Sequence, residues 1–132
     1  MLELINIIIK FLIPSLFGSL IFFASVVAPT VFKTLDENNA RVFLRSIFPK
    51  IYLYSGILSL IITIILFFVN SFLSFIFLII TIGYFYSRQF LMHKINLASD
   101  EKKQRDFKKL HRFSVVIFVT QLMLMTIVYF LI

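Results

Sequence analysis

Four long apolar stretches dominate this chain of 132 residues, and they constrain its fold more than any other feature. The last of them, Ser114 to Leu131, carries no charged side chain. A helix that crosses the hydrocarbon core of a bilayer needs about 20 mostly apolar residues. Each stretch is apolar all round, which is not the pattern of a surface helix in a soluble protein. We therefore expect four transmembrane helices.

The composition agrees with this prediction. Hydrophobic residues make up 61% of the chain and charged residues only 14%, whereas about a quarter of the residues in a soluble domain are charged. We expect an all-α integral membrane protein, a four-helix transmembrane bundle that forms one domain over residues 1–132. The predicted spans cover residues 4–27, 51–69, 72–89 and 113–132.

The connections between the spans differ in length. Only Asn70-Ser71 separates the second and third spans, so these helices are predicted to be antiparallel neighbours. The first span is expected to end at Ala28-Pro29. Asp36-Glu37 is a helix start, and a short amphipathic helix is predicted from Glu37 to Ile47, before the second span.

Two further signals concern the later connections. Pro49 is expected to break or kink the chain before the second span, because proline lacks a backbone N–H. Ser99-Asp100-Glu101 is predicted to start another helix. That helix is expected to run through Phe107 and His111 into the fourth span without interruption.

The basic residues are distributed unevenly. Twelve of the thirteen Lys and Arg residues lie on or beside the two long connections, on one face of a four-span protein. The positive-inside rule places that face in the cytoplasm. Both termini and Asn70-Ser71 are then expected outside, so that the topology is N-out and C-out. We expect a multi-pass protein of the bacterial inner membrane.

A few polar residues fall within the predicted spans. Ser55, Ser59 and Thr63 are spaced four residues apart on the second span, and Gln121 lies on the fourth. Such residues pack membrane helices together, or they line a polar cavity. Lys10 either reaches the outer headgroups or places a charge inside the bundle. These five residues form the candidate polar interior.

Several kinds of chemistry have no support in the residues. The chain has no cysteine, which excludes disulfides, thiolate metal sites and a cysteine nucleophile. It contains no glycine-rich phosphate loop, nucleophile elbow, paired carboxylates or zinc-ligand spacing. We predict no catalytic residue, no metal site and no resident cofactor. The charge borders the spans and no soluble domain presents it, so nucleic acid is not an expected partner.

The basic face nevertheless needs a partner. Its twelve cations face five acids, which leaves a net charge of +7. Anionic headgroups of the inner leaflet are the expected partner. A second copy of the chain or another membrane protein is also an expected partner for a bundle with so little soluble mass. The candidate headgroup or ligand contacts are Arg41, Arg45, Lys50, Arg88 and Arg112.

Three stretches border the predicted spans, namely VVAPTVFKTLD, RSIFPKIYLYSG and INLASDEKKQRDFKKLHRFS. Together they resemble the transmembrane protein 205-like family of four-span membrane proteins. The matching positions are Phe48, Pro49 and Tyr52, and then Phe107, Leu110, His111 and Ser114. The resemblance covers nearly the whole chain. It implies a fold and a membrane location, because the biochemical function of that family is unknown.

A more distant resemblance is to HemJ-type protoporphyrinogen oxidases and copper-resistance D-like membrane proteins. It rests on an apolar first span ending in a turn with proline, like Ala28-Pro29, and on basic residues ahead of later spans. It implies a haem cofactor, for which His111 is the candidate ligand. HemJ-type proteins carry a haem-ligating histidine within the first span, and this first span has none.

Three functions follow as hypotheses. The first is a non-enzymatic membrane module that binds lipid or protein. The second is a membrane redox protein linked to haem or another tetrapyrrole, with His111 as a ligand. The third is an oligomeric permease for a small molecule or ion, with Ser55, Ser59 and Thr63 lining the pathway and Lys10 near its outer mouth.

Overall fold

The computed structural model describes residues 1–132, and its regular structure is entirely helical. Four continuous helical runs cover Leu2–Thr34, Glu37–Phe67, Ser71–Asp100 and Gln104–Leu131. They contain 33, 31, 30 and 28 residues, and each is long and apolar enough to cross a membrane. The predicted all-α class and the four transmembrane helices are confirmed.

Two of these runs, the first and the third, contain a π-helical turn that divides the run into two α-helices. The first run consists of α1 (Leu2–Phe22), the π-helical turn Phe23–Val27 and α2 (Ala28–Thr34). The second is α3 (Glu37–Phe67). The third consists of α4 (Ser71–Tyr86), the π-helical turn Ser87–Leu91 and α5 (Met92–Asp100), and the fourth is α6 (Gln104–Leu131).

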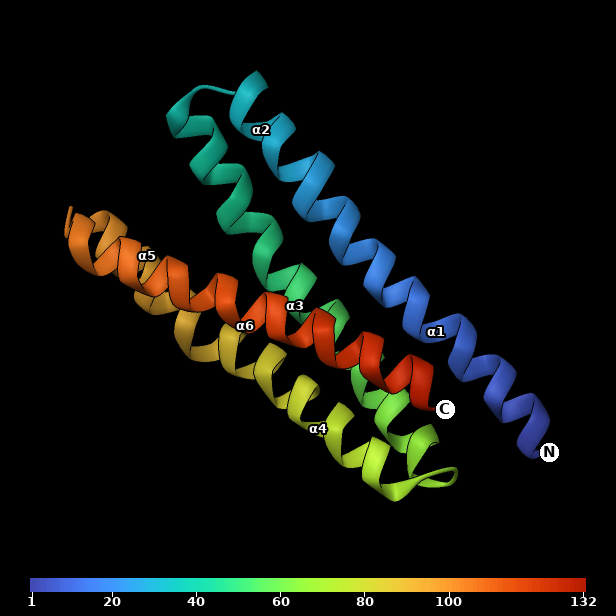
Figure 1. Cartoon of the computed structure of the whole chain (residues 1–132). Helices are drawn as coiled ribbons and strands as arrows, with labels where there is room; N and C mark the ends of the chain where they lie inside the picture. Colours follow the sequence, from blue (N-terminus) through green and yellow to red (C-terminus); the bar gives the residue numbers. More distant parts are fainter.

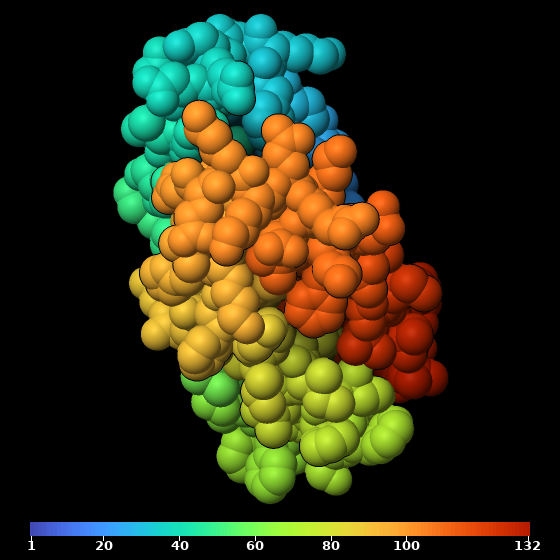
Figure 2. Space-filling model, turned by 90° about the vertical axis from the view of Figure 1, so that its left-hand side faces the viewer, coloured from blue at the N-terminus to red at the C-terminus, as the bar shows by residue number.

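The helices run alternately up and down (Figure 1). The α1 helix packs on α3, α3 packs along α4, and α6 lies against α4 and touches α1. Both termini and the α3–α4 turn lie at one end of the molecule, and the other two turns lie at the opposite end (Figure 1). In Figure 2 the α5–α6 turn, in orange, lies in the same half of the molecule as the cyan α2–α3 turn.

The core is formed by one apolar stripe from each helix. On α1 the buried residues Ile9, Ile13, Leu16 and Leu20 recur every three or four positions, which places them on one face. Phe77 and Tyr84 of α4 are the largest side chains that are almost completely buried. Large apolar side chains cover the outside of all four runs. A bilayer would cover this outer surface, because it is as apolar as the lipid.

The first span does not end at Ala28-Pro29 as expected, since the helix continues to Thr34. Pro29 lies in the first turn of α2, directly after the π-helical turn Phe23–Val27. The N–H of Ala28 donates to the carbonyl of Phe23, five residues earlier. A local π-helical adjustment of this kind lets a transmembrane helix accommodate a proline without stopping.

Pro49 also fails to interrupt its helix. It lies within α3, so the separate amphipathic helix expected from Glu37 to Ile47 is the first part of this single helix. The proline removes one hydrogen bond, the one that the carbonyl of Arg45 would accept. The carbonyl of Pro49 itself accepts a hydrogen bond of 3.2 Å from Nε of Arg88. The α3 helix packs on α1, α2, α4 and the π-helical turn Ser87–Leu91, and it stays continuous through Pro49.

Ser99-Asp100-Glu101 ends a helix and does not begin one. The third run extends past the predicted limit at residue 89 to Asp100, and α6 begins at Gln104. The N–H of Lys103 donates to the carbonyl of Ala98, and the N–H of Lys102 donates to that of Ser99. With Lys102 at a φ of 56°, this is a Schellman ending. The motif usually has glycine where Lys102 stands, so the sequence lacks its usual signal.

Two other local predictions are confirmed. The α6 helix runs from Gln104 through Phe107 and His111 to Leu131 without a break. Asn70 makes the tight connection between α3 and α4, since its side-chain oxygen accepts hydrogen bonds from the N–H groups of Phe72 and Leu73. An asparagine in this capping position satisfies donors that the first turn leaves free.

Candidate functional site

Ser55, Ser59 and Thr63 of α3, which we call the hydroxyl stripe, lie on the buried face of this helix. Ser55 and Ser59 are completely buried, and Thr63 is nearly so. The hydroxyls of Thr63 and Thr81 are 3.2 Å apart, and the Ser74 hydroxyl donates to the carbonyl of Thr63 at 2.8 Å. These contacts join two neighbouring helices. The stripe therefore has the geometry of a helix-packing surface.

Gln121 forms the corresponding contact between α6 and α4. It is buried, and its Nε2 donates to the carbonyl of Ile80 at 3.0 Å. A methyl group on Gly83 would lie 2.5 Å from this nitrogen, so alanine at this position would force Gln121 to shift. Ser55, Ser59, Thr63 and Gln121 are thus all buried. The side chains of Ser59, Thr63 and Gln121 make hydrogen bonds to a neighbouring helix or to their own backbone, whereas the Ser55 hydroxyl has no partner.

Lys10 is the exception among the residues expected in the interior. It is exposed on the outer surface of α1, so it does not belong to a polar interior. The reason is its helical position: Ile9 and Ile13 occupy the inward face, and Lys10 is turned about 100° from Ile9. A long side chain at this place can reach the headgroups near the end of the helix.

Two of the candidate headgroup contacts are engaged within the protein. Arg45 holds Asp100 with both terminal nitrogens, at 3.2 and 2.6 Å, and it also donates to the carbonyl of Asn96. Arg88 donates to the carbonyl of Pro49 and to the side chain of Gln89. Both arginines tie α3 to the third run. The hydrogen bond from Arg45 lowers the pKa of Asp100 below its ordinary value of 3.8.

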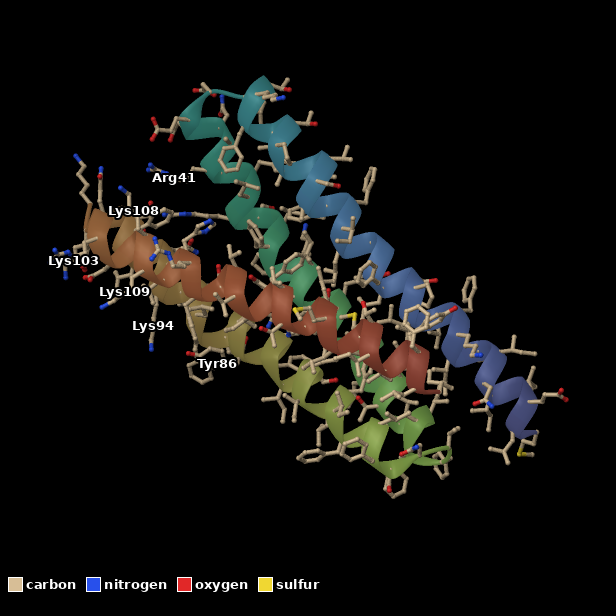
Figure 3. The ribbon with its side chains drawn as sticks, in the orientation of Figure 1. Arg41, Tyr86, Lys94, Lys103, Lys108 and Lys109 are labelled. Carbon is tan, nitrogen blue, oxygen red and sulfur yellow. The ribbon has the colours of Figure 1, made fainter.

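The other candidate contacts are free or weakly engaged. Lys50 and Arg112 are exposed and have no carboxylate within 4.0 Å, and Arg41 only approaches Glu37, at 3.8 Å. Of the twelve cations at this end, three make ion pairs: Arg41, Arg45 and Lys103. The remaining nine have no acidic partner. Figure 3 shows Arg41 of α3 at the same end of the molecule as Lys94, Lys103, Lys108 and Lys109.

The densest group of free cations lies on α6. Arg105, Lys108, Lys109 and Arg112 are all exposed, and with Gln104 they line an open hollow on the surface. Of these four residues, only Arg112 is among the headgroup contacts predicted from the sequence. The spacing i, i+3, i+4, i+7 places all four on one face of a helix, and this pattern is visible in the sequence. We call these four residues the α6 basic stripe.

The same face of α6 becomes apolar beyond Arg112. Beyond Arg112, exposed apolar side chains recur at intervals of three or four residues, namely Val116, Val119, Met123, Ile127 and Phe130. The opposite face holds the buried residues Gln121, Leu122, Met125 and Val128. The outer face of α6 is therefore charged over its first two turns and mainly apolar over the rest, where Thr120 and Thr126 are the exposed polar residues.

His111 lies on the surface of α6. Its ring stacks on that of Phe107, with centroids 6.1 Å apart and an angle of 7° between the planes. Its carbonyl accepts a hydrogen bond from the Ser114 hydroxyl. No three His, Asp or Glu side chains come together in a group that could hold a metal ion. The structure places His111 at the boundary of the charged and apolar parts of α6.

Comparison with known protein families gives one match. Residues 11–132 match the family described as a domain of unknown function, DUF4149. The chain belongs to this family. The match includes the hydroxyl stripe, the α6 basic stripe and His111, so all of these lie within the DUF4149 region. No curated protein and no solved structure matches the chain.

Proposed function

We propose that this DUF4149 protein is a non-enzymatic membrane module that binds anionic phospholipids through its basic end. One observation carries the proposal: twelve of thirteen Lys and Arg residues lie at one end of the bundle, and nine of them have no acidic partner. This end borders the apolar surface that a bilayer would cover. An anionic headgroup at the membrane surface would neutralise these charges.

The electrostatic attraction is large enough to matter. A basic residue near an anionic membrane surface contributes about 1 kcal/mol of attraction. Nine cations without an acidic partner at one end would therefore hold several anionic headgroups, although salt weakens such exposed interactions. The basic end belongs in the cytoplasm of a bacterial inner membrane according to the positive-inside rule. The resemblance to transmembrane protein 205-like proteins supports the same architecture.

The lipids that copurify with the protein test this proposal. The protein is extracted in a mild detergent, and the bound phospholipids are compared by mass spectrometry with those of the membrane from which it came. We expect anionic phospholipids to be enriched. The enrichment should fall as the salt concentration rises from 0.1 to 1 M, because the screening length shrinks from about 10 Å to about 3 Å.

The enrichment of anionic lipids is then compared between variants at the basic end and a variant at the opposite end. Combined replacement of the free or weakly paired candidates, Arg41→Gln, Lys50→Gln and Arg112→Gln, should reduce the enrichment. Lys10→Gln removes the basic residue outside the basic end and should leave it unchanged. A bound lipid composition equal to that of the parent membrane would contradict the proposal.

An absorption spectrum of the same sample tests the haem hypothesis separately. A Soret band that disappears in His111→Ala would replace the lipid-binding proposal with a redox function. A spectrum without this band, also after haem is added, would remove the haem hypothesis and leave the proposal standing.

A further inference from the structure

The α6 basic stripe differs from the other cations at the same end. Its four residues occupy two helical turns, so that they span about 10 Å along the axis. All four are exposed, and none has a carboxylate within 4.0 Å. The other five cations without an acidic partner are Lys33, Lys50, Arg88, Lys94 and Lys102, and each lies in a different helix or turn. The stripe is therefore a local concentration of uncompensated charge.

The stripe is followed by a surface that suits acyl chains. Val116, Val119 and Met123 continue the same face and are 56%, 46% and 60% exposed. Met123 lies about 16 Å along the axis from Arg112, at 1.5 Å per residue. That distance corresponds to roughly one leaflet, half of a hydrocarbon core about 30 Å thick. A phospholipid with its headgroup on the stripe would lie with its chains along this surface.

We infer that the outer face of α6 is a binding site for a phospholipid that carries two phosphates in one headgroup. This inference rests on the proposed function and names the lipid class. A headgroup with one phosphodiester brings one negative charge to four cations. Two linked phosphates bring twice the charge, and the second phosphate binds at a high effective concentration once the first is in place.

The order of the residues fits such a headgroup. Each turn of the stripe pairs an arginine with a lysine: Arg105 with Lys108 in the first turn, and Arg112 with Lys109 in the second. Arginine binds phosphate oxygens in a forked, two-point geometry, and lysine adds a compact charge. The two arginines are seven residues apart, which lets two phosphates separated by a short linker be bound at the same time.

The experiment uses the full chain in lipid nanodiscs with three defined probes. These are cardiolipin, which has two linked phosphates, phosphatidylglycerol, which has one, and phosphatidylcholine, which is zwitterionic. Retained lipid is measured by native mass spectrometry after the lipids are offered at equal phosphate concentration. We expect cardiolipin to be retained at least tenfold better than phosphatidylglycerol, and phosphatidylcholine to be retained least.

Two variants with equal charge loss locate the site. The test variant neutralises the stripe, with Arg105→Gln, Lys108→Gln, Lys109→Gln and Arg112→Gln. The control removes four cations elsewhere at the same end, with Lys33→Gln, Lys50→Gln, Lys94→Gln and Lys102→Gln. The test variant should lose the preference for cardiolipin over phosphatidylglycerol. The control should retain less of both anionic lipids, because Lys50 is one of the candidate headgroup contacts, but it should keep the preference for cardiolipin. Circular dichroism checks that both remain helical, and Lys108→Gln with Lys109→Gln replaces the test variant if it does not fold.

The outcomes separate the inference from the proposed function. Equal retention of phosphatidylglycerol and cardiolipin per phosphate would overturn the inference and leave general binding of anionic lipid intact. If the test and control variants lost the preference for cardiolipin equally, the inference would also be overturned. The preference would then depend on the total charge of the basic end and not on the α6 basic stripe. Retention of phosphatidylcholine equal to that of both anionic lipids would overturn the inference and the proposed function together.

Discussion

Arg45 and Asp100 form the most specific polar contact at the basic end. They are 55 positions apart in sequence, and the guanidinium holds both carboxylate oxygens. A paired fork of this kind has a defined geometry, although the two side chains are partly exposed, with 32% and 52% of their surface accessible. Arg45 therefore positions the end of α5, and with it the turn that leads into α6.

The Arg45–Asp100 pair should make stability depend on pH. Arg45 lowers the pKa of Asp100 in the folded protein, so the pair stabilises the fold above the ordinary pKa of 3.8. This contribution is lost as the pH falls through the lower, folded-state pKa. Asp100→Asn should thus lower the melting temperature at pH 7, and the difference from wild type should shrink at pH 3 and below.

Thermal melting followed by circular dichroism measures this effect, because the chain has no tryptophan for fluorescence. Glu3→Gln is a suitable control, since Glu3 makes no ion pair. A difference between Asp100→Asn and wild type that stays constant from pH 7 to pH 3 would exclude this role for the ionised carboxylate.

The contacts between helices depend on small and polar side chains. The α3–α4 and α4–α6 contacts are close at Gly56 and Gly83, whereas Gly18 on α1 has open space around it. A methyl group on Gly56 would lie 2.8 Å from the ring of Phe85. Lipid is as apolar as leucine, so close packing of this kind is what holds membrane helices together.

Replacement of each of the three glycines by alanine should change the stability of the bundle differently. Gly56→Ala and Gly83→Ala should each destabilise the bundle by about 1 to 3 kcal/mol, the range for overpacked cores. At Gly83 the added methyl group would also displace Gln121 from the carbonyl of Ile80. Gly18→Ala should be neutral or stabilise by about 0.5 to 1 kcal/mol, since alanine favours a helix where space is open.

Melting temperatures in one detergent compare the three variants. Gly18→Ala serves as the control, because it makes the same chemical change on an exposed face. If all three variants melted alike, the helix contacts described for Gly56 and Gly83 would be wrong.

The whole molecule has two unlike ends. One carries both termini and the short Asn70 turn, and the other carries the free cations (Figures 1 and 3). This division is the basis of our proposal that the basic end lies in the cytoplasm, because cytoplasmic connections are rich in Lys and Arg. The same division makes the topology simple to test.

Single cysteines can report the topology, since the chain has none of its own. We expect Ser71→Cys, at the α3–α4 turn, to react with an impermeant maleimide in intact cells. Asn39→Cys, in the first turn of α3, should react only after the cells are opened. Both side chains are exposed and uncharged, so neither change disturbs the charge distribution. The reverse labelling pattern would place the basic end outside.

Much of the architecture could be predicted because its signals are local. The length of an apolar stretch shows whether a helix can cross a bilayer, and this identified all four transmembrane helices. The spacing of Ser55, Ser59 and Thr63 is equally local, and it indicated the face of α3 that is buried. The α6 basic stripe could have been predicted in the same way.

The tertiary structure decided where helices end and which charges are free. Pro29 and Pro49 were expected at helix boundaries, but both lie within continuous helical runs, and a π-helical turn precedes Pro29. Asp100 was expected near the start of a helix, but it ends α5, and backbone hydrogen bonds from Lys102 and Lys103 close the turn. Lys10 lies outside the bundle because Ile9 and Ile13 fill the inward positions. Each result depends on hydrogen bonds or packing with neighbours in the folded chain, and a residue's own preference cannot reveal such partners.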